Sequence, residues 1–171
     1  MTGLDPEKES IIEIATIITD SNLKIVAEGP NLIVRQSEKL LKAMDAWNQK
    51  QHKKSGLIER VRKSKITLKQ AETKTLQFIK KYCLPGQSPL CGNTIDQDRR
   101  FIIKYMPQVN EFLHYRNIDV SSLKALVKFW YPKDKNLPKK SESHRALSDI
   151  RESIEELRYY RKTYFPKVRL T

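Results

Sequence analysis

The sequence predicts an α/β protein in which a mixed sheet is flanked by helices. The early part of the chain is rich in isoleucine and broken by turn residues, which is typical of an antiparallel meander. Later short apolar segments alternate with segments of helical periodicity, a pattern that places helices on the faces of a sheet. The 171 residues contain no internal repeat and can bury one core, so we expect a single domain over 1–171.

Three strands are expected before the first helix. Residues 9–20 carry isoleucines and threonines and predict a buried strand. The turn Ser21-Asn22 leads into a second strand over 23–28, and Gly29-Pro30 separates it from a third over 31–35. Consecutive strands with short turns favour an antiparallel meander.

The next part of the chain predicts helices. Ser37 is a good N-cap for a helix whose apolar face would carry Met44 and Trp47. A short helix is expected over 57–63. A capping box at Thr67-Leu-Lys-Gln70 begins another helix, whose inward residues would be Ala71, Leu76 and Ile79.

Short strands then alternate with helices. The strand over 89–92 precedes a helix that a capping box at Thr94-Ile-Asp-Gln97 would begin, and the strand over 117–120 precedes a helix capped by Ser121. The last helix is expected over 143–161. Its apolar residues recur at steps of three and four, so they should pack on the core: Leu147, Ile150, Ile154 and Leu157.

The composition excludes a membrane span and leaves the partner open. No apolar segment approaches the roughly 20 residues that a span requires. The net charge of +13 attracts polyanions, but the lysines are scattered, so a solvated surface explains the charge as well as a nucleic-acid partner does. Cys83 and Cys91 have no metal-ligand spacing and are interpreted as reduced packing residues of a cytoplasmic protein.

Three residues are candidates for chemistry: Asp98, His144 and Asp149. On an ideal helix His144 and Asp149 lie roughly 140° apart, so they share a site only if His144 precedes the regular helix. Carboxylates on separate segments that end strands or begin helices suit Mg²⁺. The blander alternative is a capping histidine and a solvated aspartate. Asp96 should face solvent.

Six blocks are spread along almost the whole chain. They are Met-Thr-Gly-Leu-Asp-Pro (1–6), Ile-Ile-Glu-Ile-Ala (11–15), Ala-Glu-Gly-Pro (27–30), Cys-Gly-Asn-Thr-Ile-Asp-Gln-Asp-Arg-Arg-Phe (91–101), His-Tyr-Arg-Asn-Ile-Asp-Val-Ser-Ser-Leu-Lys (114–124) and the helix over 144–160. Together, and in this order, these blocks resemble the DEDDh exonucleases, which have a ribonuclease-H-like fold. The block at 114–124 and Met44-Asp-Ala-Trp47 are narrower and resemble the oligoribonucleases within that family.

The resemblance implies a homodimeric 3′-to-5′ exoribonuclease that degrades short single-stranded RNAs to 5′-mononucleotides. Two divalent ions, Mg²⁺ or Mn²⁺, would hold the scissile phosphate and the attacking water. By motif position Asp98 and Asp149 would be metal ligands, and His144 the general base. Tyr115 would reach the active site of the neighbouring subunit; as an alternative, it packs at a strand edge.

The resemblance also implies residues that bind RNA. Leu4 and Trp47 would sandwich the terminal base, although the periodicity alone would place Trp47 in the core. The groups that grip phosphates would be His52, Thr94, Arg116 and Ser121, with Thr94 in place of the more usual serine.

The sequence departs from the family at one place. The family's Asp-x-Glu motif, on the first central strand, would lie immediately before Met1, so the sheet should lack that strand and the metal site two carboxylates. We expect an incomplete product of a working enzyme. The alternative is a shortened, inactive relic that binds RNA or dimerises. A DNA-directed proofreading relative is disfavoured by the block at 114–124.

Overall fold

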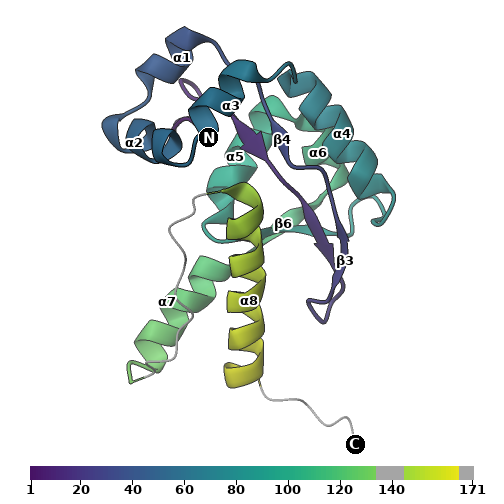
Figure 1. Ribbon diagram of the computed structural model, residues 1–171. Helices are drawn as coiled ribbons and strands as arrows, with labels where there is room; N and C mark the ends of the chain where they lie inside the picture. Colours follow the sequence, from purple (N-terminus) through teal and green to yellow (C-terminus); the bar gives the residue numbers. More distant parts are fainter. Residues whose placement is uncertain (134–144, 166–171) are drawn as a thin grey trace, which may run out of the picture.

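The structure, a computed structural model, describes residues 1–133 and 145–165. In this part of the chain a group of short strands is followed by a group of helices, and only then do single strands alternate with helices (Figure 1). Its elements in chain order are β1 (Glu13–Ile14), β2 (Ile17–Thr19), β3 (Ile25–Glu28), β4 (Leu32–Ile33), α1 (Glu38–Ala43), α2 (Ala46–Lys54), α3 (Leu57–Lys63), α4 (Leu68–Lys80), β5 (Pro89–Gly92), α5 (Ile95–Tyr105), α6 (Pro107–Phe112), β6 (His114–Asp119), α7 (Val120–Trp130) and α8 (Ala146–Tyr164).

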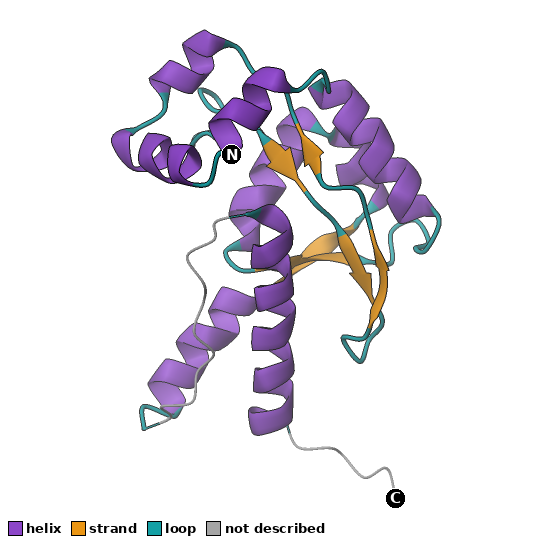
Figure 2. Ribbon diagram, in the orientation of Figure 1, coloured by secondary structure: helices purple, strands orange, loops and turns teal. Residues whose placement is uncertain are grey.

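The strands confirm the α/β class and pair two by two (Figure 2). β1 pairs antiparallel with β4, and β2 with β3. The strands predicted over 23–28 and 31–35 therefore both pair with the first predicted strand, whereas a meander would pair them with each other, so the predicted meander is wrong and the pairing is that of one long hairpin. β5 and β6 are parallel, with Gly92 opposite Asp119. Within residues 1–133 and 145–165 no strand joins the antiparallel pairs to the parallel pair, so the expected mixed sheet takes the form of three ladders. The strand predicted over 9–20 is divided into β1 and β2.

The main core lies between the first strands and helices α4, α5 and α6. Helix α4 buries the three predicted residues Ala71, Leu76 and Ile79, and its predicted capping box is present. Figure 1 shows α4 and α6 beside β4 and β3. The other buried members of this core are Ile11, Leu32, Val34, Phe101, Ile102, Met106, Val109 and Leu113.

The helix predicted from Ser37 through Trp47 is two helices. The chain is extended at Met44, and the Asp45 carboxylate accepts a hydrogen bond from Asn48 N at 2.9 Å, so α2 begins there. The apolar periodicity did not reveal this break. Aspartate is favoured at an N-cap more than in the interior of a helix, so a new helix begins after Asp45. Trp47 therefore lies in the first turn of a new helix.

Two predicted caps are wrong. Thr94 has the left-handed φ of 53° and makes no capping hydrogen bond, so its capping box does not form. Helix α7 is capped by Asp119 and not by Ser121, because β6 continues to Asp119 and its carboxylate accepts from Ser121 N at 3.0 Å. In both cases the local sequence pattern is overridden by a contact with a neighbouring segment.

Helix α8 packs with an unexpected face. Its fully buried residues are Ser153, Glu156 and Tyr160, whereas the predicted apolar stripe is only half-buried. The stripe was expected to pack in the core; instead three of its members line a cavity: Ile150, Ile154 and Leu157. None of the helices in the described part of the chain is both long and apolar enough to cross a membrane.

Candidate active site

A cavity of about 630 Å³ lies between the N-terminal segment, α2, the β5–α5 turn and α8. Five residues that the sequence singled out line it: Leu4, Trp47, His52, Asp98 and Asp149. They come from four segments that are far apart in the chain. Asp98 and Asp149 thus line the same cavity, whereas their joint binding of one ion stays a prediction.

Asp98 and Asp149 approach the cavity from different helices. Asp98 is in the first turn of α5, where burial raises the pKa of its carboxyl above the ordinary value. Asp149 is in the first turn of α8. Their oxygens suit a hard divalent cation, although two carboxylates do not balance the charge of two such ions. Among the described residues no three His, Cys, Asp or Glu side chains form a metal-binding group.

Glu13 is a third carboxylate in the cavity, and the sequence reasoning missed it. Arg145 donates two hydrogen bonds to Glu13, from Nη2 at 2.7 Å and from Nε at 3.2 Å. The backbone N–H of Ala146 donates a third at 3.3 Å. Burial alone would raise the pKa of Glu13, but these bonds and the Arg145 charge outweigh it and lower the pKa. The available signal was a carboxylate within an isoleucine-rich strand.

The rim of the cavity carries apolar side chains. Trp47 is 58% exposed and Leu4 is 70% exposed, so neither belongs to the core. His52 is buried, and its Nε2 lies 3.0 Å from the carbonyl oxygen of Met1. Because a carbonyl oxygen only accepts, Nε2 carries the proton and donates. His52 thus fixes the segment that presents Leu4.

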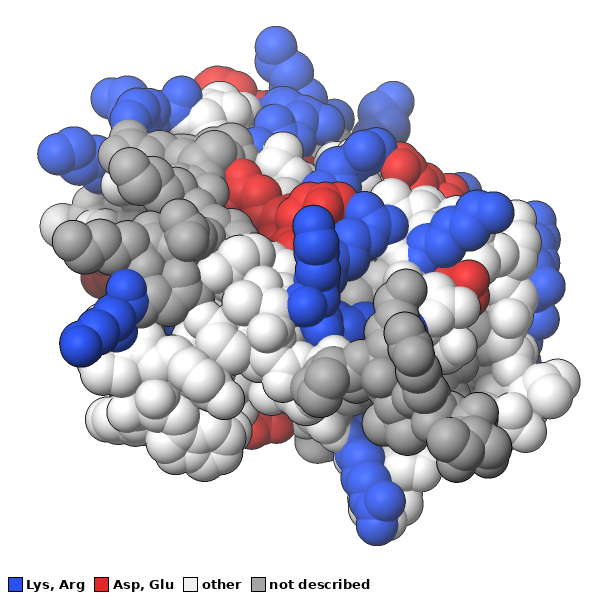
Figure 3. Space-filling model, turned by 90° about the horizontal axis from the view of Figure 1, so that it is seen from below, with Lys and Arg blue, Asp and Glu red and all other residues white. Residues whose placement is uncertain are grey.

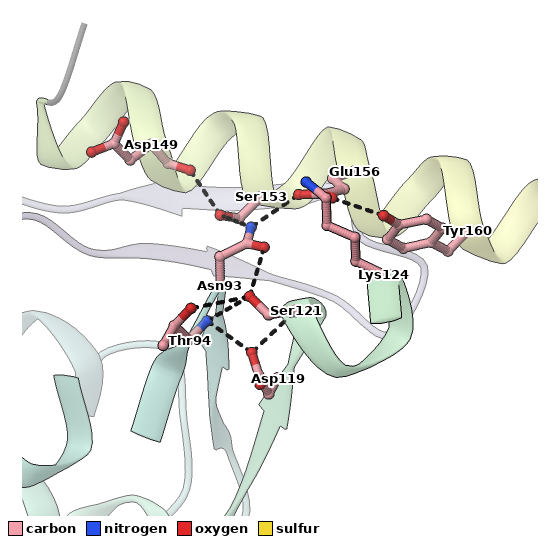
Figure 4. Close-up of polar contacts among 9 residues, drawn as sticks. All are labelled: Asn93, Thr94, Asp119, Ser121, Lys124, Asp149, Ser153, Glu156 and Tyr160. Carbon is pink, nitrogen blue, oxygen red and sulfur yellow. Dashed lines mark hydrogen bonds and ion pairs between the residues drawn. The ribbon is translucent and has the colours of Figure 1, made fainter. Parts of the chain in front are cut away.

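Four predicted residues do not line the cavity: Thr94, Tyr115, Arg116 and Ser121. Thr94 N donates to Asp119 Oδ1 at 2.8 Å and to Ser121 Oγ at 2.9 Å, which holds the two hydroxyl residues together (Figure 4). Tyr115 and Arg116 lie on β6; Tyr115 is 75% exposed, and the Arg116 guanidinium lies 5.2 Å from its ring centroid.

The two remaining residues that the sequence singled out are His144 and Asp96. His144 lies outside the described residues, so its predicted position before the regular helix is untested. Asp96 is exposed as predicted, and its Oδ1 accepts a hydrogen bond from Asn117 Nδ2 at 2.6 Å.

Comparison with known proteins identifies relatives over most of the chain. The family described as "Exonuclease" matches residues 1–157. The oligoribonuclease of Acinetobacter baylyi is 56% identical over 167 residues, which cover 98% of this chain and 91% of that protein. The oligoribonuclease of Haemophilus influenzae is 57% identical over 164 residues, covering 96% and 90%. That of Coxiella burnetii is 56% identical over 161 residues, covering 94% and 88%.

Proposed function

Because the chain belongs to the exonuclease family, and within it to the oligoribonucleases, we propose that it degrades short single-stranded RNAs from the 3′ end to 5′-mononucleotides. The chain is an exoribonuclease, and residues 1–171 act as one exonuclease domain. The observation that supports the chemistry is the cavity shared by Asp98, Asp149, Trp47 and Leu4.

In this proposal Asp98 and Asp149 hold a divalent ion, Mg²⁺ or Mn²⁺. Their oxygen atoms and their delivery from two helices into one cavity support this assignment. Such an ion, when bound, polarises the scissile phosphate and lowers the pKa of the attacking water. His144 accepts the proton of that water, because a neutral imidazole is a base near neutral pH.

The RNA end binds beside the carboxylates. Trp47 and Leu4 stack on the terminal base, which an indole face can stabilise by roughly 1–3 kcal/mol without sequence preference. Their exposure at the cavity rim supports this role. The proposed phosphate-gripping groups lie in different places: His52 lines the cavity, whereas Thr94, Arg116 and Ser121 lie outside it. A closed phosphate pocket would favour the shortest RNAs, because a longer chain has no space to continue.

The protein acts as a homodimer in this proposal, with Tyr115 completing the site of the neighbouring subunit. Tyr115 is exposed and does not line the cavity of its own chain. Helix α7 ends in the exposed aromatic residues Phe129 and Trp130, next to Tyr131, which is exposed to a smaller extent. Figure 3 shows scattered basic side chains and an uncharged area on the side where α7 lies. These surfaces suit contact with a second copy.

The carboxylates of an Asp-x-Glu segment would complete the metal charge. The cavity lies against β1 through Ile14 and against β5 through Cys91 and Gly92, and these two strands are not paired with each other. We propose that a strand with this motif, added to the protein, fits between them. Adding it should raise turnover by several orders of magnitude; equal turnover would refute this assignment.

The activity is tested with a 5′-labelled RNA dinucleotide and a long single-stranded RNA. We expect 5′-mononucleotide products that require Mg²⁺ or Mn²⁺, disappear with a chelator, and form faster from the dinucleotide. Internal fragments, or a preference for long single-stranded DNA, would contradict the proposal. The relatives named above do not favour the inactive alternative. We also propose a cytoplasmic location, which the free thiols of Cys83 and Cys91 support.

A further inference from the structure

We infer that Asn93 is a positioning residue, which fixes the helix carrying Asp149 to the turn carrying Thr94. Asn93 lies between β5 and α5 and lines the cavity. The inference rests on the proposed function, because it assigns Asn93 to the same reaction. It concerns how Asp149, the proposed metal ligand, is kept at a fixed distance from Thr94, the proposed phosphate-binding residue.

Both ends of the Asn93 amide are used. Nδ2 donates to Ser153 Oγ at 2.8 Å and to Glu156 Oε2 at 3.1 Å, both on α8 (Figure 4). Oδ1 accepts from Ser121 Oγ at 3.1 Å. The orientation of the amide follows from chemistry, because a carboxylate can only accept and therefore faces the amide nitrogen.

On the α8 side the amide enters a buried polar cluster. Ser153 Oγ donates to the carbonyl oxygen of Asp149 at 2.8 Å, one turn earlier on the helix. Glu156 is 2% exposed and accepts from the hydroxyl of Tyr160, itself fully buried, at 2.8 Å. Lys124 Nζ, on α7, lies 3.3 Å from the same carboxylate. In this buried cluster each polar group relies on the others as its hydrogen-bond partners.

On the turn side the amide meets the two hydroxyl residues. Ser121 Oγ accepts from Thr94 N at 2.9 Å while it donates to Asn93, so its hydrogen bonds have a fixed direction. Asn93 is therefore one residue linked to both halves of the site. Catalytic geometry tolerates displacements of only about 0.5 Å, so a loosened link should weaken metal binding before it unfolds the protein.

The chemistry of the cluster predicts which residues can replace Asn93. Asn93→Asp keeps the shape but turns a carboxylate toward the Glu156 carboxylate, and both can only accept. Glu156→Gln turns an amide nitrogen toward the Asn93 nitrogen, and both can only donate. The double variant Asn93→Asp/Glu156→Gln exchanges donor and acceptor, so the link forms again with reversed polarity.

The test uses the full chain and Mn²⁺, titrated in the presence of 5′-uridine monophosphate. Free Mn²⁺ is followed by electron paramagnetic resonance. We expect Asn93→Asp and Asn93→Ala each to raise the half-saturating Mn²⁺ concentration about ten-fold. The double variant should return to within about three-fold of wild type, because the link between residues 93 and 156 forms again and the remaining changes are the hydrogen bond to Ser153 and the ion pair of Glu156 with Lys124. Thr73→Ala, which removes an exposed hydroxyl that donates to the carbonyl oxygen of Lys69 on α4, should match wild type.

Three outcomes decide the inference. Wild-type Mn²⁺ binding in Asn93→Asp, or a double variant no better than Asn93→Asp, would overturn it. If Asn93→Asp does not fold, a folded double variant that binds Mn²⁺ supports the link, and an unfolded one refutes it. If wild type itself binds no Mn²⁺, the proposed metal site fails. Hydrogen exchange of α8, faster in Asn93→Asp and restored in the double variant, would then show that the link exists without that function.

Discussion

Replacing Glu13 by glutamine should destabilise the start of α8. The Glu13 side chain is 4% exposed, and it accepts from Arg145 at 2.7 and 3.2 Å and from the N–H of Ala146 at 3.3 Å. Hydrogen bonds to charged groups contribute about 1.5–3 kcal/mol, and glutamine keeps one acceptor for Arg145. We expect Glu13→Gln to lose about 2 kcal/mol of unfolding free energy at pH 7, or about 4–8 °C in Tm.

The loss should depend on pH in one direction. The pKa of Glu13 is lowered in the folded protein, so its stabilising effect is present above the ordinary pKa of glutamate and disappears as the pH falls through the lowered pKa. The glutamine side chain of the variant does not titrate. The difference between wild type and variant should therefore be full at pH 7 and shrink below about pH 4.

Urea unfolding at pH 7, 5 and 3 measures this difference, and the chain offers a matched control. Arg151 makes the same kind of pair with Glu28 at 2.7 and 2.8 Å, also between α8 and one of the antiparallel strands, but both side chains are exposed. Glu28→Gln should therefore lose less than about 0.5 kcal/mol. Equal losses in the two variants, or a Glu13→Gln loss that persists at pH 3, would refute the reasoning.

Five further variants test the site and the proposed dimer. Trp47→Ala should raise the Kd for an RNA dinucleotide about 10- to 100-fold in equilibrium dialysis, while Trp47→Phe retains most of the affinity; an unchanged Kd for Trp47→Ala would exclude stacking. Wild type should gain about 2.7 kcal/mol of stability at a Mn²⁺ concentration 100 times its Kd, seen as a rise in Tm, and Asp98→Asn should lose most of this gain; an equal rise would remove Asp98 from the metal site. Phe129→Asp should convert dimers to monomers in light scattering, whereas Tyr115→Phe should keep the dimer and lower turnover; a monomeric wild type would contradict the homodimer.

The sequence correctly predicted those elements whose capping and turn residues belong to the element itself or directly flank it. The capping box at Thr67–Gln70 forms because both partners belong to one turn, and β5 has the predicted bounds because turn residues flank it. The break at Met44 and the cap at Asp119 were not predicted, since each depends on where an adjacent element ends.

The site was predictable in part. The motif positions predicted that Asp98, Asp149 and Trp47 belong to one site, and all three line one cavity. The prediction was possible because the resemblance fixes where each motif lies on the fold, and the chemical role of each residue stays a prediction. The polar cluster around Asn93 was not predicted from the sequence. Asn93 and Ser153 are 60 positions apart and meet only through tertiary packing, and a helix with apolar periodicity gives no sign that it buries glutamate and serine.

The position of a bound Mn²⁺ tests the central proposal most directly. In a crystal of the full chain with Mn²⁺ and 5′-uridine monophosphate, anomalous scattering locates the ion without reference to the protein. We predict a peak within about 2.0–2.3 Å of carboxylate oxygens of both Asp98 and Asp149, with the base against Trp47. A peak that contacts neither carboxylate, or nucleotide bound outside this cavity, would contradict the assignment of the site.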